Sequence, residues 1–197
     1  MKSLTVWGVL ALFLLAGCTS VSRKDEKDVI DLSGNWNDTD SQQVADEMIK
    51  DSLGKAWLSE YKGAAKRTPV AVVGTVRNNT AEHINSETFT KELERAFVNS
   101  GKIRVVAASS DRTELRNEIR QMQGNASPET LKKLKKETGA DFFLLGVIND
   151  ITDQEKGKSV RFYQVNLELI ELETHEKVWI GQKKIKKLVE KTKFGIF

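Results

Sequence analysis

The residues of this chain that could do chemistry are few and lie far apart. Its two histidines, His83 and His175, have no second histidine or cysteine at a metal-ligand spacing. Asp150 and Asp153 form a carboxylate pair, but they belong to a polar stretch in which acidic side chains are usually solvated. The sequence also lacks the motifs of serine hydrolases, phosphate-binding loops and zinc proteases. We therefore predict that the chain is not an enzyme and uses no metal or cofactor.

The only cysteine, Cys18, is the one reactive side chain whose surroundings indicate a reaction. It ends the stretch LAGC, after an apolar run from Val6 to Leu15 that is preceded by one basic residue, Lys2. Such a run has the length of a signal peptide, because a membrane span needs about 20 apolar residues. The stretch resembles the bacterial lipobox, whose cysteine thiolate takes a diacylglyceryl group. We expect residues 1–17 to be a signal peptide and Cys18 to be the lipidation site.

The residue after the cysteine bears on the membrane that the anchor would enter. It is Thr19, where an aspartate would be the usual signal for retention in the inner membrane. We therefore expect the mature protein to be held on the outer membrane by acyl chains, facing the periplasm. An ordinary signal peptide with a coincidental cysteine, or a buried thiol, is the alternative.

Composition indicates one globular domain on a tether. The chain has 197 residues and a formal net charge of +3, which argues against a nucleic-acid partner. Residues 18–40 are polar and charged without sustained periodicity, as expected of a lipidated tether, and residues 41–197 would form the domain. Trp36 interrupts the polar tether, and we expect it to dock on the domain rather than mark a binding segment.

The first half of the domain alternates helix and strand signals. Helical spacing predicts a helix over residues 40–59, capped by Asp40 or Ser41. The β-branched run over residues 69–76 predicts a central strand buried on both faces. A third segment, closed by Gly101 and opened by Asn85 or Ser86, predicts an amphipathic helix whose apolar face carries Phe89, Leu93, Ala96 and Phe97.

The second half contains further helices and then strands. Residues 103–107 predict a short strand, followed by a helix with Leu115, Ile119 and Met122 on one face and a helix that starts at Pro128 and ends at Gly139. Strands are expected at 140–148, at 162–172 with Phe162, Val165, Leu167 and Leu169 on one face, and after the ETHEK turn; residues 149–161 are expected to form a mobile loop. The fold class is α+β, with helices packed around a central mixed or mainly antiparallel sheet of about five strands.

Two groups of polar residues are candidates for binding a partner. The first follows the buried strand and comprises Arg77, Asn78, Asn79 and Thr80; turn chemistry is its alternative explanation. The second is the lysine-rich end, represented by Lys184 and Lys187. There the alternative is that lysines protect a sheet edge from pairing with other chains, whereas attraction to an acidic partner or an anionic cell-wall polymer would be a binding function.

Taken in order, several junctions resemble one family, the LpoB-type lipoproteins, which are outer-membrane activators of penicillin-binding proteins. They are the lipobox and the stretches DLSGNWNDTDS, AVVGTVRNNT, LERAFVNSGKIRVV, KKETGADFFLLGVI and LELIELETHEKVWIG. The likeness covers roughly residues 32–187. It implies a small domain that reaches through the peptidoglycan to a bifunctional penicillin-binding protein and stimulates it without doing chemistry.

This chain departs from the best-studied members in one respect, because its tether is short and has no proline. The alternative function is therefore a structural or assembly adaptor of the outer membrane that has no synthase partner.

Overall fold

The computed structural model describes residues 21–25, 28–106, 129, 132, 135, 136 and 138–190. Within these residues it contains three helices, α1 (Asp38–Ser52), α2 (Ala56–Ala65) and α3 (Ser86–Asn99). The strands are β1 (Val70–Val73), β2 (Arg77–Asn78), β3 (Arg104–Val105), β4 (Phe142–Glu155), β5 (Lys158–Glu171) and β6 (Lys177–Glu190).

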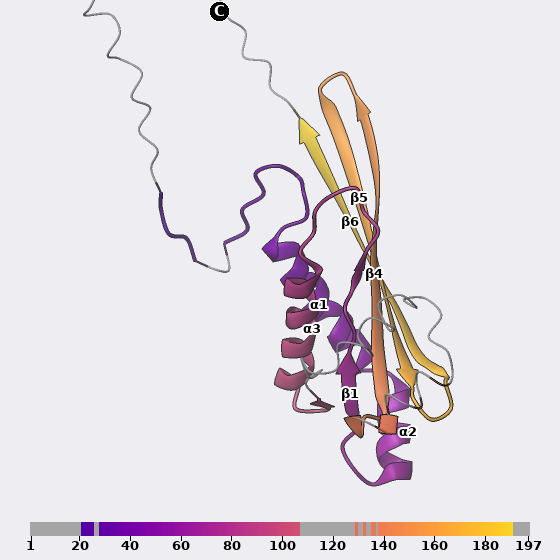
Figure 1. Ribbon diagram of the computed structural model, residues 1–197. Helices are drawn as coiled ribbons and strands as arrows, with labels where there is room; N and C mark the ends of the chain where they lie inside the picture. Colours follow the sequence, from indigo (N-terminus) through magenta and orange to yellow (C-terminus); the bar gives the residue numbers. More distant parts are fainter. Residues whose placement is uncertain are drawn as a thin grey trace, which may run out of the picture.

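The described strands form one mixed sheet. Its order is β3-β1-β4-β5-β6, with β2 pairing β4 separately. Strands β1 and β3 are parallel to each other, and β1 and β2 are parallel to β4, whereas β4, β5 and β6 form an antiparallel meander. Helices α1 and α3 lie side by side against the sheet (Figure 1), and α1 also contacts β6. The predicted α+β class with a mixed sheet is confirmed.

The core lies between these two helices and one face of the sheet, which we call the inner face. Phe89, Leu93 and Phe97 of α3 are fully buried there, as their helical spacing predicted. The N-cap of α3 is Asn85, whose side-chain oxygen accepts hydrogen bonds from the backbone N–H groups of Glu87 and Thr88. The amphipathic helix therefore has the predicted start and orientation.

The single helix expected over residues 40–59 is in fact two. Helix α1 ends at Ser52, and the chain turns at Leu53 to Lys55 before α2 begins. The cap also differs from the prediction, because Asn37 is the N-cap and Asp40 is its reciprocal partner in a capping box. Trp36 lies directly before this cap and packs edge-on against Phe89 and Tyr163, which confirms that it docks on the domain.

The strand predicted over residues 69–76 is shorter, since β1 ends at Val73. It is central and buried, as expected. The predicted helix with Leu115, Ile119 and Met122 lies outside the described residues. Of the helix expected to end at Gly139, five described residues are helical, and Gly139 has a φ of 65° that suits a helix C-terminus.

The largest correction concerns residues 149–161, which were expected to be a mobile loop. They continue β4 to Glu155, reverse at Lys156 and Gly157, and start β5 at Lys158. Both turn residues have positive φ, 44° and 85°, as the tight two-residue turns of β-hairpins require. The hairpin is paired to its end, with Glu155 opposite Lys158.

Strand β6 follows this hairpin along its whole length, to Glu190 opposite Lys158. The free part of the three strands, residues 149–155, 158–164 and 184–190, is called the arm. It extends past the ends of α1 and α3 (Figure 1). The lysine-rich end of the chain is therefore part of a strand up to Glu190, and β6 is an edge strand of the sheet.

Candidate partner-binding face

The sheet has a second face, turned away from α1 and α3, which we call the outer face. Side chains alternate between the two faces along each strand. On β5, Tyr163, Val165, Leu167 and Leu169 are buried on the inner face. Phe162 was predicted to share their face, but it is one residue out of phase and lies on the outer face; Tyr163 takes the inner position. The pairing register then places the odd residues 145–153 of β4 and the even residues 180–188 of β6 on the outer face.

The first group of candidates divides into two roles. Asn78 and Thr80 make turn contacts: the Asn78 side-chain oxygen accepts from the Thr80 backbone N–H at 2.9 Å and from its hydroxyl at 2.7 Å. The Asn78 amide also donates to the Glu82 carbonyl at 2.8 Å. Arg77 and Asn79 are exposed. Turn chemistry therefore accounts for Asn78 and Thr80, and the side chains presented to solvent are the other two.

The sheet brings Asn79 and Lys184 into one polar row on the outer face. The Asn79 amide donates to the Asn149 side-chain oxygen at 3.2 Å. Asn149 is opposite Gln164, and Gln164 is opposite the exposed Lys184. At about 4.8 Å per strand, the two ends of this row are roughly 14 Å apart. Two candidates from distant parts of the sequence therefore share one surface.

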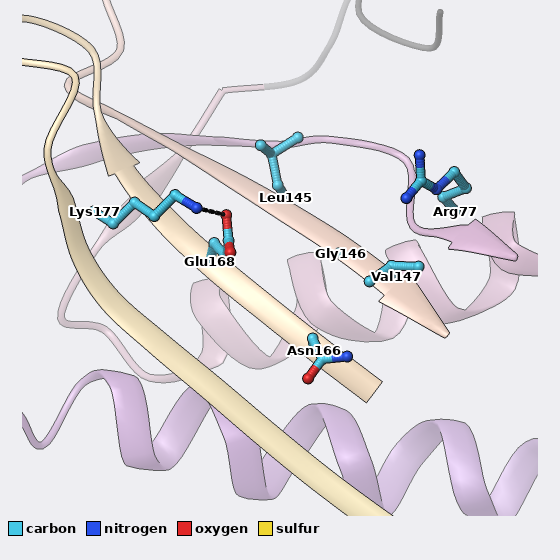
Figure 2. Close-up of a pocket in the computed structure, with 7 residues that line it drawn as sticks. All are labelled: Arg77, Leu145, Gly146, Val147, Asn166, Glu168 and Lys177. Atoms are coloured by element: carbon cyan, nitrogen blue, oxygen red, sulfur yellow. Dashed lines mark ion pairs between the residues drawn. The ribbon is translucent and has the colours of Figure 1, made fainter. Parts of the chain in front are cut away.

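Arg77 lies in the adjacent row, beside a shallow hollow of about 220 Å³. Figure 2 shows its side chain near Val147, with the helices behind the strands. Across the hollow, Lys177 and Glu168 form an ion pair at 2.8 Å. The hollow is lined by Arg77, Leu145, Gly146, Val147, Asn166, Glu168 and Lys177. It offers amide and charged groups over an apolar floor, which suits a contact with a protein side chain better than it suits catalysis.

Lys187 was expected to be a surface contact, but it is buried on the inner face with 9% of its surface exposed. Its ammonium lies 2.6 Å from an Asp40 carboxylate oxygen and 3.0 Å from one of Asp31, and it donates to the Asn35 carbonyl at 3.0 Å. These partners all belong to the N-terminal segment. Lys187 therefore holds that segment on the sheet, which removes it from the accessible binding surface.

Glu82 holds the same segment from the other side, and no sequence pattern pointed to it. Its carboxylate accepts from the Trp36 backbone N–H at 3.1 Å and from the Tyr163 hydroxyl at 2.6 Å, and it pairs with Arg161. Burial raises the pKa of Tyr163 to about 12. The tyrosine therefore stays a neutral hydrogen-bond donor. The segment assigned to the tether is held on the domain from Asp31 onward.

Asp141 is a further group whose pKa is shifted by structural contacts. Burial acts to raise the pKa of Asp141, but hydrogen bonds from Arg67, from the nearby Tyr61 and from the Val70 N–H outweigh it and hold that pKa below its usual range. Arg67 meets Asp141 through two N–H donors, at 2.8 and 2.6 Å. Among the described residues, no group of three or more histidine, cysteine, aspartate or glutamate side chains could hold a metal ion. These contacts join α2 to the sheet and form no catalytic arrangement.

Comparison with known proteins decides the family. The sequence matches the family described as "Peptidoglycan-synthase activator LpoB" over residues 40–185. The chain belongs to the LpoB family. It is thus a peptidoglycan-synthase activator by family and not an enzyme, which confirms the resemblance and the predicted lack of catalysis. No curated protein sequence gives a significant match.

The solved structures to which this chain is similar include LpoB proteins of two bacteria. The C-terminal domain of Salmonella enterica LpoB has 18% identity and a TM-score of 0.48, covering 75% of this chain and 99% of that one. Escherichia coli LpoB, solved by NMR, has 16% identity and a TM-score of 0.48, covering 89% and 83%. Lipoprotein GNA1162 from Neisseria meningitidis has 16% identity and a TM-score of 0.43, covering 61% and 83%. In this LpoB chain, no helix among the described residues is long and apolar enough to cross a membrane.

Proposed function

We propose that this LpoB chain is a lipoprotein, anchored at Cys18 in the outer membrane, that binds a bifunctional penicillin-binding protein from the periplasmic side and activates it. The observation that carries the proposal is the family match over residues 40–185. An activator needs only to bind the active conformation of its enzyme more tightly than the inactive one, because that difference in affinity sets the shift in population. A rigid, non-catalytic sheet face is sufficient for this task.

The part of the outer face that carries Arg77, Asn79 and Lys184 is the proposed contact surface. Arg77, Asn79 and Lys184 are exposed there, and the strands that carry them are held in place by the sheet. The tether is the segment between Cys18 and Asp31, which spans at most roughly 45 Å when fully extended. The synthase must therefore present its binding site within that distance of the outer membrane, plus the size of the domain.

The anchor is tested by replacing the cysteine. The parent chain is expected in the detergent-extracted outer-membrane fraction with acyl chains detectable by mass spectrometry, whereas Cys18→Ser should leave that fraction. Thr19→Asp is the matched control, because it keeps the cysteine and should shift the acylated protein to the inner membrane. Equal fractionation of parent and Cys18→Ser, with no acyl chain on the parent, would exclude the anchor.

The activating role is tested with purified bifunctional synthases from the source organism. The mature chain carrying Cys18→Ser should have no polymerising or cross-linking activity alone, but should raise the rate of a cognate synthase. Arg77→Ala is expected to weaken binding by about 2 kcal/mol if Arg77 is an anchor of the interface. Lys184→Ala should mainly slow association, and its effect should fade as salt is added.

The adaptor alternative gives a different result in the same assay. If no synthase binds the chain and none changes rate, the protein has no synthase partner and the activator proposal fails.

A further inference from the structure

The outer face of the arm carries a group of apolar side chains that the core does not use. Ile151 is 67% exposed and Leu188 is 63% exposed, and Val160 and Phe162 beside them are half-buried. Ile151 is paired with Phe162, and Val160 with Leu188, so these four residues occupy two adjacent rows of the sheet. Directly opposite side chains are about 5 Å apart at Cβ, which makes the four one continuous surface, the arm patch.

The arm patch belongs neither to the main core nor to the domain's smaller buried cluster, which consists of Val72, Ala140, Phe143, Ile170 and Leu172. On the opposite side of the same strands, the inner face is covered by the N-terminal segment through Trp36, Glu82 and Lys187. The arm therefore needs no apolar residues on its outer face in order to fold. A continuous exposed apolar surface on a rigid element is typical of an interaction site.

Charged residues surround the arm patch. Lys186 is opposite Phe162, and Lys184 lies two residues before it on the same face. Neither lysine makes an ion pair within the described part of the chain. At the tip, Lys158 pairs with Glu190 at 2.7 Å and Lys156 with Glu155 at 3.3 Å. An apolar centre with a charged rim is the usual layout of a protein interface.

The tip also argues against a lipid surface as the occupant. A hairpin that enters a membrane tip first has to bury its tip residues in the acyl region, where charged side chains are costly. Here the outermost row consists of Glu155, Lys158 and Glu190, with Lys156 in the turn, and the apolar side chains lie below it on a flat strand face. Charge differs across the patch: the exposed Asp153, opposite Val160, makes the β4 side negative, whereas Lys184 and Lys186 make the β6 side positive. The complementary surface therefore carries carboxylates on the β6 side.

We propose that the arm patch binds an apolar surface of a folded protein that carries carboxylates on the side facing Lys184 and Lys186. This inference rests on the proposed function, since the protein it assigns to the site is the synthase that the chain activates. Lys184 belongs both to the rim of the arm patch and to the polar row that reaches Asn79, so the two surfaces are continuous. The arm then supplies the apolar centre of the contact, and the row supplies its polar edge.

The test compares Leu188 and Ile180, two exposed apolar residues of similar size on β6, and includes Ile151 on β4. All variants are made in the mature chain that carries Cys18→Ser. Each is titrated over the immobilised cognate synthase, and the dissociation constant is measured. Leu188→Asp and Ile151→Asp should each weaken binding about 30-fold, the size expected at the centre of an interface. Ile180→Asp is the control, because Ile180 is also 63% exposed on the outer face of β6 but lies about 27 Å away. It should bind like the parent, and thermal melts should show that all variants are folded.

A charge test examines the rim separately. Lys184→Glu combined with Lys186→Glu should slow association several-fold at low salt and much less at high salt. If the parent activates a synthase but Leu188→Asp and Ile151→Asp bind like the parent, the arm patch is not the contact, although the proposed function stands. If the parent binds no synthase at all, the proposed function itself fails.

Two further outcomes would also overturn the arm patch as the synthase contact. If Ile180→Asp lost as much affinity for the synthase as Leu188→Asp, the contact would cover the whole outer face. Binding of the parent to vesicles of anionic phospholipid that is lost in Leu188→Asp, with synthase binding unchanged, would identify a lipid surface as the occupant.

Discussion

Replacing Phe97 with alanine is expected to lower the free energy of unfolding by roughly 3 to 5 kcal/mol. Phe97 has none of its surface exposed and belongs to the main core cluster, together with Phe89 and Leu93 of the same helix. Removing the ring takes away its transfer free energy and leaves a cavity that the packed helix and sheet can close only in part. Chemical denaturation monitored by circular dichroism measures the change directly.

The control for this prediction is the next residue of α3. Val98 is 56% exposed, so Val98→Ala removes apolar surface from the same helix without opening a cavity. It should change the free energy of unfolding by less than about 0.5 kcal/mol. Equal stability of the parent and Phe97→Ala would mean that the helix does not pack on the sheet through this face.

Replacing Lys187 with methionine is expected to cost roughly 3 to 5 kcal/mol of unfolding free energy, since it breaks a buried ion pair and leaves the other charge unpaired. Asp40 is itself 7% exposed, and the same carboxylate oxygen also accepts the Asn37 backbone N–H at 2.9 Å in the capping box. Methionine fills a similar volume, so the loss comes from charge and hydrogen bonding more than from packing. Denaturant titration of the purified domain gives the value.

A lysine on the same strand separates this effect from a general effect of charge. Lys184 is exposed on the outer face, and Lys184→Met should be close to neutral for stability. Adding Asp40→Asn to Lys187→Met should recover part of the loss, because the amide removes the uncompensated charge. A Lys187→Met variant as stable as the parent would show that the buried ion pair of Lys187 with Asp40 contributes nothing to the stability of the fold.

Elements with a complete local signal were predictable from sequence. Helix α3 combines an apolar face at helical spacing with Asn85 as its cap, and both features recur in the structure. The prediction of one helix over residues 40–59 was wrong because the spacing of apolar residues continues through the turn at Leu53 to Lys55. The spacing of apolar residues alone does not indicate the turn between α1 and α2.

The arm could not be predicted from apolar alternation. Residues 149–161 are mostly polar because both faces of the arm lack a complete core behind them. Their order comes from a ladder of backbone hydrogen bonds and from pairs across the strands, such as Lys158 with Glu190. The one local signal was the Lys156-Gly157 turn, because glycine readily takes positive φ.

The candidate site was predictable in part. Sequence reasoning selected Arg77, Asn79 and Lys184, which the sheet brings to one face. It also selected Lys187, because a lysine run gives no information about which members are buried. Because side chains alternate between the two faces along β6, Lys184 lies on the outer face and Lys187 on the inner face. The partners that bury Lys187 lie in a segment that is remote in the sequence.

The docking of the N-terminal segment on β6 also sets an order of folding. Asp40 and Lys187 are 147 residues apart in sequence, whereas β4, β5 and β6 close on one another through short turns. Closing a long loop costs more entropy than closing a short one, so the meander can form before the segment has a surface to bind. Because the ribosome synthesises the chain from its N-terminus, Asn35 and Asp40 emerge early but reach their contacts with Lys187 last, after β6 has been made.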